Sequence, residues 1–259
     1  PGSGILGLGI CLDLAGNDRY CQGLAPAFDA RARSRHDLVV ADPEGDSTHL
    51  VPFAELYADD AGGVWLDTGF AYGAGFLGIG ILHDHAGDDL YLGQKYAFGC
   101  GYWKGIGVLR DDGGNDVYAA GKAALGAGIN AAVGLLDDRG GNDHYQCLGL
   151  YESGYSAGRE WDNGYDGSGI GYGSCWRAEA RNAEPEYRWQ ATLGGGLGLV
   201  RDHGGNDEYV AGSFAIGSGY AGGVGMVMDD AGDDTWFVKR GPGGSNHNGW
   251  SGNHALGNG

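Results

Sequence analysis

Aspartate and asparagine recur in this chain with a spacing that suits the binding of a hard cation. Six copies of one motif each hold an Asp, two variable residues, a Gly, an Asn or Asp, and a second Asp. Carboxylate, amide and carbonyl oxygens are the ligands of Ca²⁺, which takes about six to eight of them at about 2.3–2.6 Å. The sequence therefore predicts Ca²⁺ as a cofactor. The candidate ligands are Asp13, Asn17, Asp18, Asp84, Asp88, Asp89, Asp111, Asn115, Asp116, Asp138, Asn142, Asp143, Asp202, Asn206, Asp207, Asp229, Asp233 and Asp234.

The motif also permits a purely structural interpretation, in which Asp and Asn form turns by accepting hydrogen bonds from nearby backbone N–H groups. Gly stands three places after the first Asp in every copy, where a turn with positive φ favours it. If equivalent Asp residues stack about 4.8 Å apart, each pair of charges repels by about 3–4 kcal/mol at an effective dielectric constant of 20. A bound cation would offset that repulsion, so we predict that Ca²⁺ raises the melting temperature.

A fixed pitch indicates the architecture that positions these residues. Successive copies begin at Asp84, Asp111 and Asp138 and again at Asp202 and Asp229, always 27 residues apart. Internal periods of 20 to 50 residues are typical of solenoids, whose units are stabilised mainly by their neighbours. We therefore predict an all-β fold, a parallel β-solenoid of about 27-residue coils.

Each coil is predicted to hold three short strands. Gly alternates with aliphatic residues before the first Asp, as in 78–81, and alternation with period two indicates a strand. A Gly-rich strand is predicted to precede it, as in 97–101, and a third strand is predicted to begin with the aromatic residue after the second Asp, as at Tyr118. An antiparallel β-meander or barrel of repeated hairpins is the alternative, and it would separate equivalent Asp residues by about 10 Å instead of about 5 Å.

Two long insertions, at about 24–70 and 151–190, interrupt the repeat within a single domain of residues 1–259. In repeat proteins insertions lie on one face, which is often the binding face. The second insertion makes a carbohydrate-binding or carbohydrate-active β-helix the alternative function, although no catalytic spacing supports an enzyme. Its candidate ligand-binding residues are Tyr155, Trp161, Tyr165, Trp176 and Trp189.

Composition limits the partners. The chain has 16 basic and 34 acidic residues and a net charge of −18, which disfavours nucleic acid and anionic membranes and favours divalent cations. It contains no apolar run of about 18 residues, so no transmembrane helix is predicted, and no signal peptide is seen. Four histidines in or beside the motif, His83, His85, His144 and His203, stand at unequal positions, which leaves a transition-metal site as a minor alternative.

The segment Gly114-Asn115-Asp116-Val117-Tyr118 resembles the second half of the repeats-in-toxin (RTX) calcium-binding nonapeptide, G-G-x-G-x-D-x-U-x. The resemblance implies that the second Asp of each copy is a calcium ligand. It covers about six residues per unit and lacks the opening Gly pair. Together with the acidity it leads us to expect a secreted or cell-surface structural or adhesive scaffold stabilised by calcium. Because the chain begins and ends within a unit, we expect part of a longer array, or a filament protomer that binds copies of itself end to end.

Overall fold

The computed structural model describes residues 1–21, 39–41, 48–50, 70–147, 169–174, 194–211, 216–220 and 222–238. These residues form β-strands and no helix, so none of them makes a helix that could span a bilayer. The strands are β1 (Gly4–Ile5), β2 (Leu8–Leu12), β3 (Arg19–Cys21), β4 (Val39–Ala41), β5 (Thr48–Leu50), β6 (Gly75–Phe76), β7 (Ile79–Asp84), β8 (Leu90–Lys95), β9 (Gly101–Tyr102), β10 (Ile106–Asp111), β11 (Val117–Lys122), β12 (Gly128–Ile129), β13 (Val133–Asp138), β14 (His144–Cys147), β15 (Gly173–Ser174), β16 (Leu197–Asp202), β17 (Glu208–Ala211), β18 (Gly219–Tyr220), β19 (Val224–Asp229) and β20 (Thr235–Val238).

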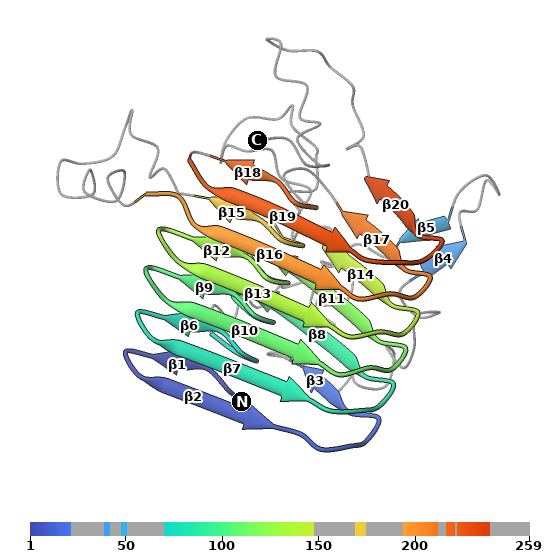
Figure 1. Cartoon of the computed structure of the whole chain (residues 1–259), viewed down its shortest axis with the longest axis horizontal. Helices are drawn as coiled ribbons and strands as arrows, with labels where there is room; N and C mark the ends of the chain where they lie inside the picture. The colour runs from blue at the N-terminus through green and yellow to red at the C-terminus, as the bar shows by residue number, and fades with distance from the viewer. Residues whose placement is uncertain are drawn as a thin grey trace, which may run out of the picture.

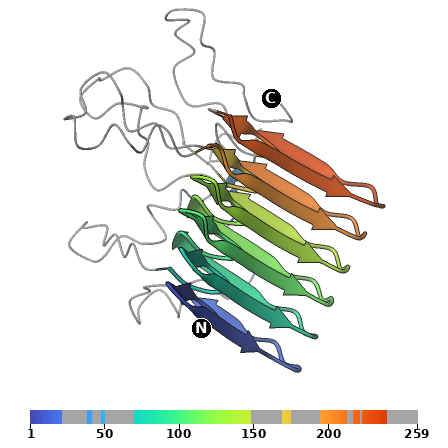
Figure 2. The same ribbon diagram turned by 60° about the vertical axis from the view of Figure 1, so that its left-hand side comes forward.

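Eighteen of the strands build a parallel β-solenoid of six coils (Figure 1). Sheet 1 has the order β1-β6-β9-β12-β15-β18, sheet 2 has β2-β7-β10-β13-β16-β19, and sheet 3 has β3-β8-β11-β14-β17-β20. Each coil contributes one strand to each sheet, and the coils lie one above another in the order of the sequence (Figure 2). The predicted parallel solenoid is confirmed, and the antiparallel alternative is wrong for these strands. The remaining strands, β4 and β5, form an antiparallel pair.

Motif residues stack in register from coil to coil. Asp111 at the end of β10 pairs with Asp84 of β7 on one side and with Asp138 of β13 on the other. The same register continues to Asp202 and Asp229 although 64 residues separate Asp138 from Asp202. The solenoid therefore absorbs its long insertion without losing the alignment of the motif.

Glycine is required in the repeat because backbones approach closely, both within and between coils. A Cβ added to Gly107 in β10 would lie 2.2 Å from the carbonyl oxygen of Cys100, just before β9, so sheets 1 and 2 pack backbone to backbone. A Cβ on Gly114 in the motif turn would lie 1.5 Å from the carbonyl oxygen of Gly87 in the coil below. A column of glycines can form either a thin interior or a flat outer face, and in this solenoid the glycines form a thin interior.

The Gly-rich strand predicted at 97–101 is shorter than expected. Only Gly101 and Tyr102 pair as β9, because Phe98 and Gly99 have φ values of 54° and 76°. Leu125 and Gly126 repeat this left-handed bend before β12 with φ values of 51° and 72°. The bend places Phe98 and Leu125 in the core, where both are fully buried. Burial of one large side chain per coil thus accounts for a backbone that alternation alone does not predict.

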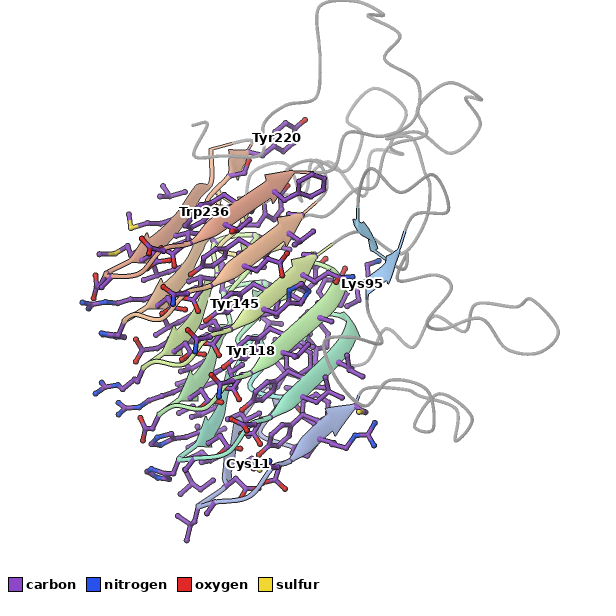
Figure 3. The ribbon with its side chains drawn as sticks, turned by 90° about the vertical axis from the view of Figure 1, so that its right-hand side faces the viewer. Cys11, Lys95, Tyr118, Tyr145, Tyr220 and Trp236 are labelled. Atoms are coloured by element: carbon purple, nitrogen blue, oxygen red, sulfur yellow. The ribbon has the colours of Figure 1, made fainter. Side chains whose placement is uncertain are left out.

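The core is filled by stacked equivalents of a few positions. Leu82, Leu109 and Leu136 of sheet 2 pack in one cluster with the tyrosines of sheet 3. Tyr118 and Tyr145 stack with ring centroids 4.8 Å apart and planes 5° apart, and Figure 3 shows them in one column with Trp236. The whole column runs through Tyr20, Tyr91, Tyr118, Tyr145, Tyr209 and Trp236.

The outer face of sheet 2 is aliphatic where its strands begin, whereas His83, Arg110, Asp137 and Arg201 occupy that face near the strand ends. The first residue of its strands points outward, and Ile79, Ile106, Val133, Leu197 and Val224 are 39–53 % exposed. Glycine follows each of them and faces sheet 1. Because the strands lie in register, these side chains form a straight row along the solenoid.

Candidate metal centre

The anchor Asp, as we call the first Asp of each motif copy, is held inside the solenoid by strand alternation. Side chains of a strand alternate between its two faces, so Asp84 points inward like Leu82, two residues before it. The same pattern holds in β10, β13 and β16, and the four anchor residues Asp84, Asp111, Asp138 and Asp202 are fully buried. Asp13 and Asp229, in the coils at either end, are partly exposed. The sequence thus directs a carboxylate into the interior at the end of each sheet 2 strand.

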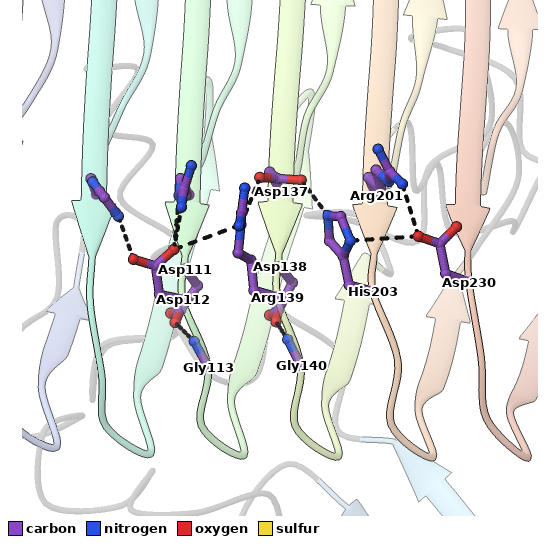
Figure 4. Close-up of polar contacts among 12 residues, drawn as sticks. Asp111, Asp112, Gly113, Asp137, Asp138, Arg139, Gly140, Arg201, His203 and Asp230 are labelled. Atoms are coloured by element: carbon purple, nitrogen blue, oxygen red, sulfur yellow. Dashed lines mark hydrogen bonds and ion pairs between the residues drawn. The ribbon is translucent and has the colours of Figure 1, made fainter.

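One oxygen of the anchor carboxylate closes the turn that follows. The Gly113 N–H donates to Asp111 Oδ1 at 3.0 Å, and the Gly140 N–H donates to Asp138 Oδ1 at 2.9 Å (Figure 4). Gly204 repeats the bond to its own anchor residue at 2.8 Å. For this oxygen the turn-forming interpretation of the motif is correct.

The other oxygen accepts a hydrogen bond from the tyrosine of the preceding coil. Tyr91 Oη donates to Asp111 Oδ2 at 2.6 Å, and Tyr118 Oη donates to Asp138 Oδ2 at 2.6 Å. The full series joins Tyr20 to Asp84, Tyr91 to Asp111, Tyr118 to Asp138, Tyr145 to Asp202 and Tyr209 to Asp229. The sequence pattern predicts this tyrosine only as the start of a strand. Tyr stands at this position in five of the six copies, and this recurring hydroxyl is the sequence signal that could have indicated the hydrogen bond.

The second Asp, five residues after the anchor, lines the same interior but has an oxygen without a partner. Its Oδ1 accepts the N–H of the equivalent residue one coil below, as from Asp89 to Asp116 and from Asp116 to Asp143, both at 2.7 Å. Its Oδ2 is buried and finds no hydrogen-bond partner among the described residues in Asp18, Asp89, Asp116, Asp143 and Asp207. A buried, unpaired carboxylate oxygen is costly, by about 1–3 kcal/mol or more for a charged group. A row of such oxygens needs a partner, either a bound cation or a proton.

Burial and crowding also change the proton affinity of this row. Burial, and then the neighbouring carboxylates, raise the pKa of Asp89 and of Asp207 to about 7, although each side chain accepts a backbone hydrogen bond that opposes the shift. The same two causes raise the pKa of Asp116 and Asp143 still further, because these residues lie deeper in the stack. At neutral pH the row therefore holds protons unless a cation replaces them.

Anchor and second Asp residues meet in groups of three. Carboxylate oxygens of Asp89, Asp111 and Asp116 all lie within 4.8 Å of one another. Three further groups are Asp116, Asp138 and Asp143; Asp143, Asp202 and Asp207; and Asp13, Asp18 and Asp84. Three of these groups are joined through a shared second Asp, Asp116 or Asp143, and each coil adds two carboxylates to the row. One divalent cation per coil would neutralise that charge.

The Asn or Asp between the two is not part of these groups. Asn17, Asp88, Asn115, Asn142, Asn206 and Asp233 form a separate, exposed ladder. There the side chain accepts the backbone N–H of the coil above, as from Asn115 to Asp88 at 2.8 Å. Of the predicted ligands, the structure therefore brings the two Asp columns together and leaves the middle column apart. The candidate residues of the second insertion, Tyr155, Trp161, Tyr165, Trp176 and Trp189, lie outside the described residues.

Outside the solenoid, the same turns carry a chain of arginine–carboxylate ion pairs and histidine–carboxylate contacts that links neighbouring coils. Arg110 Nη2 lies 2.7 Å from Asp112 Oδ1, and His203 Nε2 lies 3.0 Å from Asp137 Oδ1. Figure 4 shows Asp112, Asp137, His203 and other members in a line across the ends of the sheet 2 strands. Exposed pairs of this kind are worth about 0–1 kcal/mol each. They mark the outer side of the turn whose inner side holds the carboxylate row.

Comparison of the chain with protein-family models, with curated proteins and with solved structures gave no match, so the interpretation of the site rests on its own geometry and chemistry.

Proposed function

We propose that this protein is a rigid repeat scaffold whose interior aspartate row binds Ca²⁺ between successive coils. The observation that carries the proposal is the buried Oδ2 of the second Asp, which lacks a partner among the described residues of five coils in succession. Each residue that carries such an atom lies in a group with an anchor carboxylate of its own coil or of the next. A cation at that position would satisfy the unpaired oxygens and join the two coils.

The chemistry of the groups favours Ca²⁺ over other cations. The side-chain ligands offered by the four groups named above are all carboxylate oxygens, which suit a hard ion, with no imidazole or thiolate among them. Mg²⁺ demands octahedral geometry and keeps several waters, whereas the anchor residues Asp84, Asp111, Asp138 and Asp202 are fully buried. Ca²⁺ accepts irregular geometry with more ligands, and it tolerates oxygens that also accept hydrogen bonds, as Asp116 Oδ1 does from the Asp89 N–H.

Thermal unfolding of the full chain in chelator, in Mg²⁺ and in Ca²⁺ tests the proposal. Ca²⁺ is expected to raise the melting temperature, because a ligand that binds only the folded state adds about 2.7 kcal/mol per site at a hundred times its Kd. At neutral pH calcium binding is also expected to release protons, since Asp116 and Asp143 must lose them to coordinate. An unchanged melting temperature at millimolar Ca²⁺, together with no proton release, would reject the calcium scaffold.

A location outside the cell or on its surface follows from the same proposal. Extracellular calcium modules work at Kd values of about 10⁻⁴ to 10⁻³ M, a range in which cytosolic sites are empty. The aliphatic outer face of sheet 2 supports the structural or adhesive part of the role, because soluble monomers rarely expose a large continuous apolar surface.

End-to-end association is the second candidate function. The six-stranded sheets end in β1, β2 and β3 on one side and in β18, β19 and β20 on the other, and edge strands present unpaired backbone groups that can pair with another chain. Large apolar side chains are exposed in both end coils, including Leu8 and Phe237. Sedimentation velocity over a range of concentrations tests this: growing oligomers support it, and a monomer at all concentrations rejects it.

A further inference from the structure

A second kind of metal ligand gathers on the outer side of the turn after β7. His83 near the end of β7 and His85 directly after β7 flank the anchor Asp84. The two imidazoles are partly exposed, whereas the carboxylate between them is fully buried. Asp112 follows β10 in the next coil, and its backbone N–H donates to the Asp84 carbonyl at 3.0 Å. That bond fixes the carboxylate of Asp112 opposite the two histidines.

The three side chains converge on one point. His83 Nε2 and His85 Nδ1 each lie 2.9 Å from Asp112 Oδ2, and the two ring centroids are 4.0 Å apart. A tetrahedral metal with bonds of about 2.0–2.2 Å separates its ligand atoms by about 3.3–3.5 Å. Each histidine nitrogen is therefore about half an ångström closer to Asp112 Oδ2 than in a metal site, and the three ligand atoms all lie within 4.8 Å of one another.

The other carboxylate oxygen of Asp112, Oδ1, is held by an arginine of the same coil. Arg110 Nε and Nη2 lie 2.8 and 2.7 Å from Asp112 Oδ1, so the guanidinium orients the carboxylate and leaves Oδ2 for the histidines. Outer hydrogen bonds of this kind commonly orient metal ligands, and removing one typically lowers metal affinity by about 10–100-fold. The side chains of His83, His85 and Asp112 are 20, 40 and 21 % exposed, so solvent reaches the point where they converge.

We propose that His83, His85 and Asp112 bind a divalent transition metal of the Zn²⁺, Cu²⁺ and Ni²⁺ class at the surface of the solenoid. Imidazole with carboxylate is a ligand set for these ions, whereas the interior row offers only oxygen. Three protein ligands leave at least one coordination position for water or another small ligand. The ion would also join β7 to the coil above. This site is independent of the interior calcium row, which uses different side chains on the other face of the turn.

The fifth coil provides a matched control. His203 occupies the position equivalent to His85, but Arg201 stands where coil 2 has His83. His203 pairs with Asp137 at 3.0 Å and with Asp230 at 3.5 Å, so it offers one imidazole in a similarly charged setting. Its substitution removes a histidine from the same row without touching the proposed triad.

Zinc titration of the full chain in saturating Ca²⁺, against a chromophoric zinc chelator, tests the site. The wild type is expected to bind one equivalent that His85→Ala and Asp112→Asn each weaken at least tenfold, while His203→Ala leaves the affinity unchanged. Melting curves establish that each variant is folded, and imidazole ¹⁵N shifts on Zn²⁺ addition should locate the change at His83 and His85. Equal zinc affinity in the wild type and in folded His85→Ala, or no binding at millimolar Zn²⁺, would overturn the proposal.

Discussion

Substitution of Asp116 by Asn should change stability in opposite directions with and without calcium. In chelator the Asn side chain keeps the Oδ1 that accepts the Asp89 N–H and replaces the unpaired Oδ2 with an amide. That amide can donate to the carboxylates of Asp111 or Asp138, which belong to the two groups that share Asp116. At neutral pH folded Asp116 must hold a proton that the unfolded carboxylate does not hold, and taking up that proton costs free energy. Asn is neutral in both states and supplies a donor, so metal-free Asp116→Asn should be more stable.

The size of the effect follows from the unpaired atom that is removed and from the cation sites that are weakened. Leaving a buried polar atom unpaired costs about 1–3 kcal/mol, so the substitution should raise the free energy of unfolding in chelator by that order. In calcium at a hundred times Kd, each cation site contributes about 2.7 kcal/mol. Because Asp116 belongs to two groups, Asp116→Asn should weaken both sites and remove most of that contribution from each. The calcium-dependent increment should fall by several kcal/mol.

Urea denaturation in chelator and in calcium measures both effects on the same samples. Asp88→Asn is the matched control, because it makes the same chemical change in the outer ladder and Asn already occupies that position in four coils. It should alter stability by less than about 0.5 kcal/mol in either condition. A destabilised Asp116→Asn in chelator, or a calcium increment equal to that of the wild type, would refute the reasoning.

The remaining predictions concern the proton balance, the packing and the tyrosine bond. In chelator the melting temperature should fall between about pH 4 and pH 7, because the pKa of Asp89 and of Asp207 is 3.8 in the unfolded chain and about 7 in the folded protein. The folded state alone holds these protons in that range, so their contribution is lost as pH rises; a rise in melting temperature there would contradict the shift. Gly114→Ala should prevent cooperative unfolding or lower stability by several kcal/mol, because the added Cβ would meet a carbonyl oxygen. Gly194→Ala is the control and should be neutral, because the space around Gly194 is open. Equal melting temperatures for the two variants would refute the close approach. Tyr145→Phe should lower the free energy of unfolding, measured by denaturation, by about 1.5–3 kcal/mol, because the buried Asp202 carboxylate loses a hydrogen bond of 2.7 Å while the ring stack remains. An unchanged free energy of unfolding would show that the bond does not stabilise the fold.

The architecture was predictable because its signals are local and repeated. The 27-residue spacing of Asp84, Asp111 and Asp138 predicts coils, and the alternation of Gly with aliphatic residues predicts strands. The bend at Phe98 and Leu125 is not predicted, because burial of those side chains forces a left-handed backbone on residues that favour strands elsewhere. The two residues recur 27 positions apart, each followed by Gly, but the alternation of residue types around them is that of a strand and does not indicate a bend.

The candidate site was predictable in its residue types and less so in its grouping. Periodicity identifies both Asp columns, but it cannot show that Asp116 faces inward while its neighbour Asn115 faces outward, because the turn between strands does not alternate. The hydroxyl partner of each anchor Asp comes from another coil, so the pairing of Tyr118 with Asp138 depends on three-dimensional register. His83 lies in β7 and His85 directly after it, and their approach to Asp112 of the next coil depends on the register between coils, which the sequence does not show.

Diffraction from crystals grown in calcium tests the central claim most directly. We expect anomalous peaks inside the solenoid beside the Oδ2 atoms of Asp116 and Asp143, at about 2.3–2.6 Å from the carboxylate oxygens and separated by one coil. Carboxylates that contact one another directly across the interior, with no peak between them at saturating calcium, would show that protons alone hold the row together and would contradict the account.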